Sequence, residues 1–384
     1  MGTFSWSSDI QPQNGCARNH DGVFLEAVQQ LVPTTVATAS TEIPATIRNE
    51  SELEEILTRP SAALIEAIKT ISSPLLVLGA GGKMGPTLAV LARRAAEAAG
   101  HPLEVVAVSR FGNASSRQWL EARGVQTASC DLLDANAIIR LPDAANIIYL
   151  VGLKFGTAQN PAATWAINTL VPARVCERYP RSRIVALSTG NVYPPSAVSR
   201  GGAVETDSLT PLGEYANAAV GRERIFEYHA HRQHTPVTLL RLFYAVELRY
   251  GVLADIARKV HTGQPVALAN GAFNCIWQRD ANDLILRALP LTAAPARVYN
   301  LCRPEVFSVR EIATRLGELL GRPPVFSGSE TTTALLGNSA QLGTALDTTA
   351  TPMETILHWT AQWVKHGGRD LGRPTHFEVR DGKY

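Results

Sequence analysis

The sequence predicts an α/β protein with a doubly wound parallel sheet, on three observations. Short apolar runs of strand length alternate with helical segments from residue 74 to about residue 245. The first run, at 75–78, is continuously apolar, which is typical of a strand buried on both faces of a parallel sheet. A glycine-rich turn and an alanine-rich helix follow it directly. This alternation favours a parallel sheet that is covered by helices on both faces.

The glycine-rich turn predicts a nucleotide site. Its sequence, Gly79-Ala80-Gly81-Gly82-Lys83-Met84-Gly85, fits both Gly-x-Gly and Gly-x-x-Gly-x-x-Gly. Pro86 suits the start of the helix expected over 87–99, because the N–H group that proline lacks would have no hydrogen-bond partner within the helix there. Unpaired N–H groups at a helix start can bind a pyrophosphate, which glycine allows to approach closely. A simple turn is the alternative. We predict that the dinucleotide is bound by Gly79, Gly82, Lys83, Met84 and Gly85.

The remaining elements follow from the same patterning. Further strands of the sheet are expected at 104–109, 127–130, 147–151, 183–187 and 237–242, and one more strand at 297–301 in the less regular part that follows. Helices are expected at 115–123, 136–141, 161–178, 214–231, 251–262, 281–289, 308–320 and 351–366.

Three parts of the chain are expected on this basis. Residues 1–72 form a partly helical N-terminal extension, 73–245 a nucleotide-binding domain, and 246–384 mainly a smaller substrate-binding lobe over the carboxyl edge of the sheet. Residues 1–49 have no clear pattern, so an ordered arm, a partner contact and a poorly ordered extension stay open.

Length, charge and cysteine content exclude several classes of protein. The 384 residues suffice for one large or two ordinary domains, and the net charge is +2 with no basic run, so we predict no nucleic-acid partner. The five scattered cysteines lack metal-ligand spacing, which predicts reduced thiols, no metal site and a cytoplasmic location. No long apolar stretch or signal pattern indicates a membrane. The predicted partner is a small-molecule substrate, and a homodimer stays open.

The ends of the second, third and fourth strands bear on the choice of nucleotide. Ser109 and Arg110 stand where an NAD-preferring fold carries an acid for the ribose 2′-hydroxyl. The planar guanidinium of Arg110 suits a 2′-phosphate, so we predict NADP in preference to NAD, with a solvated surface arginine as the alternative. Asp131 stands where its carboxylate can accept a hydrogen bond from the adenine amino group, with a helix cap as the alternative. Leu132, Val151 and Gly152 complete the predicted cofactor site.

Several separated motifs together resemble one enzyme family. Ser188-Thr189 ends the fifth strand before Asn191-Val192-Tyr193, Tyr215 opens the next helix, and Tyr299-Asn300-Leu301 lies further on. With the glycine turn and Asp131-Leu132, this order resembles the extended short-chain dehydrogenase/reductase superfamily, in its NAD-dependent epimerase/dehydratase group, over roughly 74–320. The resemblance implies a Rossmann fold and NAD(P)-dependent chemistry. It further implies that Thr189 orients the substrate oxygen and Tyr215 transfers the proton.

The chain departs from this family at a lysine. In the family, a lysine four residues after the tyrosine holds the nicotinamide ribose and lowers the tyrosine pKa, but Ala219 stands at that position here. A phenol with an ordinary pKa near 10 is a poor base at neutral pH without a nearby cation. We predict that Lys154, just past the fourth strand, supplies this cation, with a plain surface lysine as the alternative.

A second departure concerns the substrate. Tyr244 stands where nucleotide-sugar enzymes of this group usually carry an asparagine, which weakens the case for a nucleotide sugar. We predict substrate binding by Ser188, Asn191, Tyr244 and Arg249. The arginine suits an acidic substrate, with a salt-bridged surface residue as the alternative.

Three functions are consistent with these residues. The first is an NAD(P)-dependent oxidoreductase or epimerase/dehydratase that acts on a hydroxyl or keto group of a sugar-like or small polar substrate. The second is a redox-neutral lyase or epimerase with tightly bound NAD. The third is a non-catalytic NAD(P)-binding sensor, which the missing lysine would explain. Because Tyr215 and Thr189 are both present, the sequence favours an enzyme.

Overall fold

A computed structural model describes residues 43–112, 114–154, 156–157, 159–373, 375, 377–380 and 382. The chain divides into two units, 1–43 and 44–384, and the second is described below. The N-terminal segment whose role the sequence leaves open therefore lies largely outside the described residues. The two helices at the end of the predicted extension, α1 (Glu50–Leu57) and α2 (Ala62–Ile68), belong to the same unit as the sheet.

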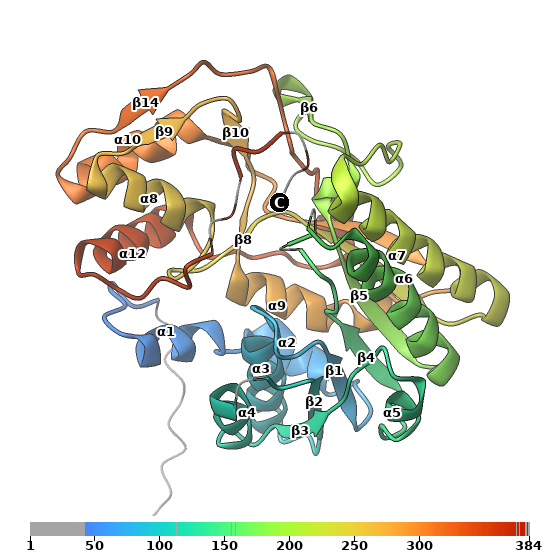
Figure 1. Ribbon diagram of the computed structural model, residues 1–384. Helices are drawn as coiled ribbons and strands as arrows, with labels where there is room; N and C mark the ends of the chain where they lie inside the picture. The colour runs from blue at the N-terminus through green and yellow to red at the C-terminus, as the bar shows by residue number, and fades with distance from the viewer. Residues whose placement is uncertain are drawn as a thin grey trace, which may run out of the picture. The chain divides into compact units, whose positions relative to one another are not determined.

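A seven-stranded sheet with the order β12-β7-β5-β4-β1-β2-β3 lies at the centre, and every pair of neighbours is parallel (Figure 1). The strands are β1 (Leu75–Leu78), β2 (Val105–Ser109), β3 (Gln126–Ser129), β4 (Asn146–Tyr149), β5 (Arg183–Thr189), β7 (Val237–Leu242) and β12 (Arg297–Leu301). The six strands predicted for the sheet are present, so the predicted doubly wound parallel sheet is confirmed. The strand predicted at 297–301, in the part assigned mainly to the lobe, is β12 and instead joins the sheet beside β7. The chain order reverses between β1 and β4, where ligands bind in such sheets.

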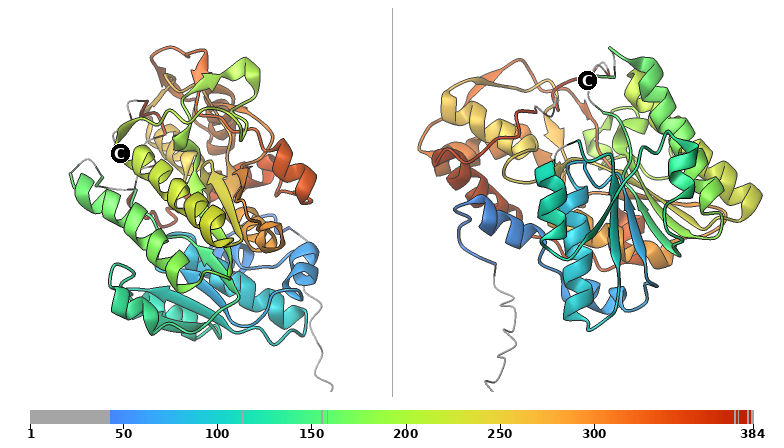
Figure 2. Two further views of the ribbon diagram at one scale, coloured as in Figure 1. Left: turned by 90° about the vertical axis from the view of Figure 1, so that its right-hand side faces the viewer. Right: turned by 60° about the horizontal axis from the view of Figure 1, so that its bottom comes forward.

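Helices cover both faces of the sheet because its strands are apolar on both sides (Figures 1 and 2). In β1, Leu75 and Val77 belong to one core and Leu76 and Leu78 to another, as the two-residue period of a strand requires. The first core also contains residues of α2 (Ala62–Ile68), α3 (Gly85–Ala98), α4 (Ala114–Glu121) and α9 (Gln278–Arg287). The second contains residues of α5 (Ala135–Ile139), α6 (Pro161–Arg178) and α7 (Gly213–Gln233).

A third core forms a smaller lobe, in which α8 (Val252–Thr262), α10 (Val309–Leu320) and α12 (Met353–Lys365) pack together (Figure 1). The rings of Trp277 and Trp359 lie 5.5 Å apart at its centre. Helix α1 (Glu50–Leu57) joins this core through Leu53 and Leu57, although it comes from the other end of the chain. The lobe is therefore built from segments on both sides of the sheet-forming residues.

The remaining elements are short and connect the larger ones. They are β6 (Ser196–Ala197), β8 (Ala245–Val246), β9 (Pro265–Ala267), β10 (Ala272–Phe273), β11 (Ile276–Trp277), β13 (Phe307–Ser308), β14 (Val325–Ser327), β15 (Thr333–Ala334), α11 (Ala340–Ala345) and the 3-10 turns η1 (Gly190–Val192), η2 (Val198–Arg200) and η3 (Leu289–Leu291). None of the helices in the described residues has the length and apolar character needed to cross a membrane.

Candidate active site

The three spaced glycines of the turn after β1 have three different structural roles. Gly79 has a φ of +82°, which L side chains rarely adopt. A Cβ atom on Gly85 would lie 2.5 Å from Ala80 Cα, so Gly85 allows α3 to pack closely on the turn. A Cβ atom on Gly82 would meet nothing nearer than Gly79 O at 3.4 Å. Gly82 therefore keeps open a space that the protein itself does not fill.

A large cavity of about 620 Å³ lies beside this turn and extends along the carboxyl edge of the sheet. Its wall contains most of the residues predicted to bind cofactor or substrate. These are Gly79, Gly82, Lys83, Met84, Gly85, Gly152, Lys154, Ser188, Thr189, Asn191, Tyr215 and Tyr244. Helix α3 begins at this wall without a side-chain cap, so its first N–H groups are available to an anion. The geometry fits the pyrophosphate of a dinucleotide.

Lys83 connects the glycine turn to the start of the lobe. Its Nζ donates a hydrogen bond to Ala245 O at 2.7 Å and lies 4.2 Å from the centre of the Tyr250 ring. Burial in the cavity wall lowers the pKa of Lys83 to about 7, an effect that Glu247 partly opposes. The ammonium group of this half-buried lysine is thus close to its titration point at neutral pH.

The residues predicted at the ends of β2 and β3 lie beyond the cavity wall. Ser109 is next to the turn, since a Cβ atom on Gly81 would lie 2.5 Å from Ser109 Oγ. Arg110 follows it and is exposed, while Leu132 is buried in the core. The Asp131 carboxylate accepts a hydrogen bond from Leu133 N at 3.0 Å, which forms a local Asx turn. The helix that follows, α5, is capped by Asp134, so Asp131 is not the helix cap. These residues flank the glycine turn on the β2 and β3 side.

The predicted catalytic residues come together in the cavity wall from three different elements. Thr189 is the last residue of β5, Tyr215 lies in the first turn of α7, and Lys154 follows β4. Thr189 Oγ1 accepts hydrogen bonds from the backbone N–H and the Nδ2 of Asn191, at 3.3 and 3.1 Å. Burial lowers the pKa of Lys154 to about 8. A hydroxyl, a phenol and an amine thus share one cavity.

Two of the four residues predicted to bind substrate are committed to other contacts. Ser188 donates a short hydrogen bond to Glu223, whose carboxylate also pairs with Arg241 at 2.7 Å. The Arg249 guanidinium pairs with Glu50 at 2.9 Å and with Glu247 at 3.2 Å, and the structure does not bring it to the cavity wall. These contacts agree with the alternative interpretation of Arg249 as a salt-bridged residue.

Asn191 and Tyr244, the other two, line the cavity. Tyr244 has a φ of +36°, an unusual value for a residue with a side chain. Such backbone strain concentrates at functional sites.

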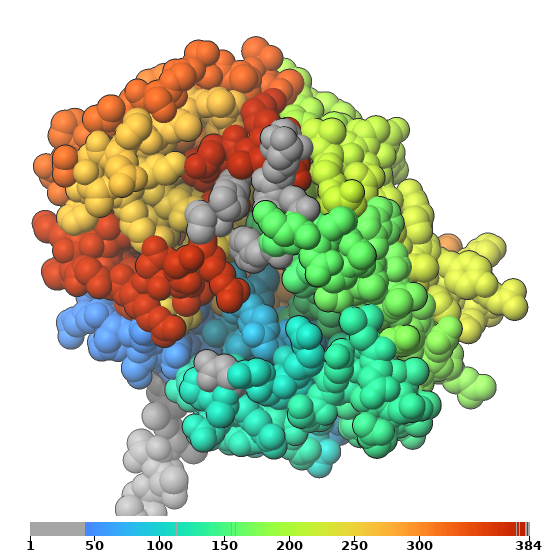
Figure 3. Space-filling model, viewed as in Figure 1, coloured from blue at the N-terminus to red at the C-terminus, as the bar shows by residue number. Residues whose placement is uncertain are grey.

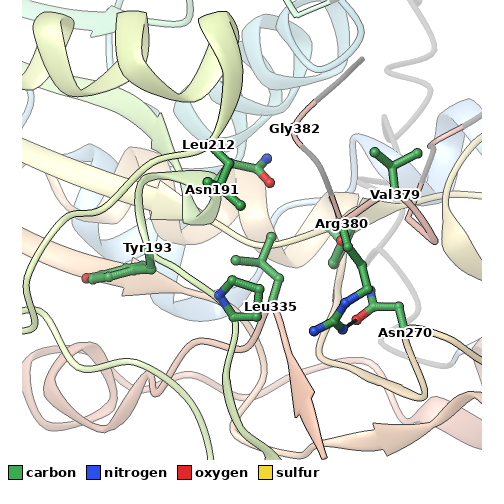
Figure 4. A pocket seen from close by; sticks show the side chains of 10 residues that line it. Asn191, Tyr193, Leu212, Asn270, Leu335, Val379, Arg380 and Gly382 are labelled. Carbon is green, nitrogen blue, oxygen red and sulfur yellow. Dashed lines mark hydrogen bonds between the residues drawn. The ribbon is translucent and has the colours of Figure 1, made fainter. Parts of the chain in front are cut away.

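Asn191, Tyr244 and Leu335 also line a smaller neighbouring pocket of about 30 Å³ (Figure 4). Arg380 and Asn270 lie together on one side of it, with Tyr193 on the other. This volume corresponds to roughly one water molecule. The large cavity is therefore the one with room for a dinucleotide and a substrate.

The cavity wall is strongly cationic. It includes Lys83, Lys154, Arg222, Arg369 and Arg373, and none of the described residues that line it is an aspartate or a glutamate. The last two arginines follow α12 in the chain, within the C-terminal part that Figure 3 colours red. The backbone N–H of Thr375 donates a hydrogen bond to Asp255 Oδ2 at 2.9 Å, which holds this segment against α8. The cavity is suited to anionic ligands.

Sequence reasoning missed Arg222, whose guanidinium donates to Val151 O at 2.9 Å and to Asn168 Oδ1 at 3.0 Å. The position of the missing lysine, Ala219, is fully buried among Val192, Tyr193 and Phe243. Tyr215, Ala219 and Arg222 are spaced by four and then three residues. This spacing places all three on one face of α7. An arginine on this otherwise small and apolar face was the available signal.

The described residues contain no group of three or more His, Cys, Asp or Glu side chains that could hold a metal ion.

Solved structures share this fold at low sequence identity. An NAD complex of UDP-glucuronic acid 4-epimerase from Bacillus cereus has a TM-score of 0.63 and 18% identity over 76% of this chain and 96% of its own. UDP-glucose 4-epimerase from Thermotoga maritima has a TM-score of 0.60 and 16% identity over 77% and 99%. An epimerase from Methanothermobacter thermautotrophicus has a TM-score of 0.64 and 17% identity over 80% and 97%. No curated protein matches the sequence.

The sheet, the glycine turn and the shared cavity define an NAD(P)-dependent enzyme of the short-chain dehydrogenase/reductase type. Within that class, the model of the NAD dependent epimerase/dehydratase family matches residues 75–302, more than half of the chain. The protein belongs to this family. The predicted family and the prediction of an enzyme are confirmed, and a non-catalytic sensor is set aside.

Proposed function

We propose that the protein is an epimerase or oxidoreductase that acts on a hydroxyl or keto group of a sugar-like or small polar substrate. The observation that carries this proposal is one cavity whose wall contains the glycine turn, Thr189 and Tyr215. The names of the similar structures, which are epimerases of UDP-glucose and UDP-glucuronic acid, support a sugar-like substrate. The cationic wall favours a substrate with a phosphate or carboxylate group.

In the proposed reaction, the cofactor and three side chains have separate roles. The nicotinamide cofactor supplies redox chemistry at a carbon atom that bears a hydroxyl group. Thr189 Oγ1 already accepts two hydrogen bonds from Asn191, so its O–H is left to donate to the substrate oxygen. Tyr215 exchanges a proton with the same oxygen. Lys154 supplies positive charge in the cavity, as a cation near a phenol favours its ionised form.

The cofactor proposal concerns its 2′ position. Arg110 follows β2 with an exposed side chain, and the strand ends in Ser109 rather than in an acid. A 2′-phosphate near this point would gain a charge-assisted contact with the guanidinium, whereas a 2′-hydroxyl would gain little. On this basis we favour NADP over NAD.

The glycine turn offers the most direct test of nucleotide binding. Gly82→Val should weaken NADPH and NADH about 100-fold, equal to about 2.7 kcal/mol. The side chain would occupy the space beside the turn that the protein leaves open, so folding should be preserved. Gly343→Val is the matched control, because a Cβ atom there also has room but lies on the exposed surface of α11.

Both variants are compared with the wild type by calorimetric titration and by thermal unfolding. Equal nucleotide affinity in a folded Gly82→Val protein would reject the proposed site.

A further inference from the structure

Arg222 is a buried cation whose hydrogen bonds go to neutral groups. Its side chain is 5% exposed, and the two acceptors of its guanidinium are a backbone carbonyl and a side-chain amide oxygen. Asn168 is oriented for this contact, because its Nδ2 donates to Thr164 O at 2.8 Å and so leaves Oδ1 to accept. Among the described residues, Arg222 Nε has no hydrogen-bond partner.

The adjacent carboxylate does not neutralise this charge. Glu223 is fully buried, and its carboxylate instead pairs with Arg241 and accepts a hydrogen bond from Ser188. Burying a guanidinium is costly unless its N–H groups are hydrogen-bonded, so its remaining donors favour a ligand with hydrogen-bond acceptors. Arg222 also lines the cavity, so a ligand in the cavity can reach it.

The position of Arg222 indicates which part of the cofactor is near. The glycine turn after β1 is the pyrophosphate site, and the adenosine half extends from it over β2 and β3. The other half must then cross the reversal of strand order and lie over β4 and β5. Arg222 bonds to Val151 O, just past β4, and a Cβ atom on Gly152 would lie 2.6 Å from its terminal nitrogen. This is the nicotinamide half.

We propose that Arg222 binds the ribose hydroxyls of the nicotinamide half, and so performs the ribose-holding part of the role that Ala219 leaves empty. The inference rests on the proposed function, since it requires a dinucleotide in the cavity. A guanidinium has donors beyond the two that Val151 and Asn168 use, and ribose hydroxyls accept hydrogen bonds. Lys154 remains the residue proposed to lower the pKa of Tyr215. The two roles of the family lysine would thus be divided between Arg222 and Lys154.

The test separates the two halves of the nucleotide by using fragments. NADH and ADP-ribose both contain the second ribose, whereas ADP ends at the pyrophosphate. Arg222→Met should weaken NADH and ADP-ribose about 10- to 100-fold and leave ADP unchanged. Arg222→Lys, which retains a charge and is the safer variant for folding, should weaken the first two about 3- to 10-fold with ADP again unchanged. Dissociation constants come from calorimetric titration, with thermal unfolding as a check on the fold.

Three results would overturn the inference. Wild-type affinity of both variants for NADH and ADP-ribose would mean that Arg222 does not contact the ribose. Equal losses for ADP would mean that Arg222 only holds α6, α7 and the end of β4 together. Failure of the wild-type protein to bind any of the three nucleotides would remove the proposed function as well, which distinguishes that outcome from the first two.

Discussion

The two sides of the strand reversal differ in how closely they follow the family pattern. On the side of β1, β2 and β3, the glycine turn has the spacing and the backbone roles that a pyrophosphate requires. On the side of β4, β5 and α7, Ala219 and Tyr244 stand where the family resemblance predicts a lysine and an asparagine, while Arg222 and Lys154 line the cavity. The proposed nucleotide site therefore relies mainly on backbone geometry on the first side and mainly on side-chain charge on the second.

This difference shows why one side is easier to interpret than the other. A glycine that makes room for a ligand occupies a fixed place in a short motif. A charge can be supplied from any segment that reaches the cavity, and here the candidates come from the loop after β4, from α7 and from the C-terminal residues. The chemistry can therefore be retained while the motif is lost.

The largest expected effect is at Tyr215, the residue proposed to transfer the proton. Tyr215→Phe should lower kcat at least about 100-fold with little change in nucleotide affinity, because the hydroxyl acts chiefly in the transition state. Tyr250→Phe is the matched control: its ring also lines the cavity and, as phenylalanine, still faces the Lys83 ammonium. Steady-state kinetics with matched nucleotide titrations provide the measurement.

Lys154→Met extends the same comparison, since it should slow turnover less than Tyr215→Phe and move the pH–rate profile. Wild-type turnover by Tyr215→Phe together with an unaltered profile for Lys154→Met would show that the second side of the site works by other residues.

An intermediate effect is expected on the first side, at Arg110. Arg110→Ala should weaken NADPH by roughly 1.5–3 kcal/mol and leave NADH nearly unchanged, because only the former has a 2′-phosphate to pair with the guanidinium. Fluorescence titration of both nucleotides gives the ratio. Equal losses, or none, would assign Arg110 to the solvated surface and remove the preference for NADP.

The smallest effect concerns Lys83, where the two sides of the cavity meet. With its pKa lowered to about 7 by burial, this lysine is mostly neutral in the empty site at pH 8. A bound pyrophosphate favours the charged form, so binding should take up a proton and weaken as the pH rises above 7, by at most about tenfold per pH unit. Below pH 7 the lysine is already charged, and the dependence should disappear.

Calorimetry in two buffers of different ionisation enthalpy measures this proton uptake. Lys83→Met should abolish it, while Lys259→Met, a lysine paired with Glu378 away from the cavity, should retain it. Uptake that persists in Lys83→Met would assign the proton to another group.

Physical reasons separate what the sequence predicts from what it does not. The strands of the sheet are predictable because their apolar runs must be buried wherever the chain goes, as in Leu75–Leu78. Arg249 is different: it pairs with Glu50, 199 positions away, and nothing local to either residue indicates that contact. Arg222 lies on a helix that was predicted. Its proposed role, however, depends on its contact with Val151 after β4, which only the fold brings near.

The third core has a consequence for how this enzyme folds. The family-matched residues, 75–302, contain Phe273 and Trp277 but omit α1, α10 and α12, which bury them. A fragment cut to the matched residues would expose these rings and would associate through them. The family-matched segment is thus not an independent module, because its lobe core is completed by residues from both sides of it.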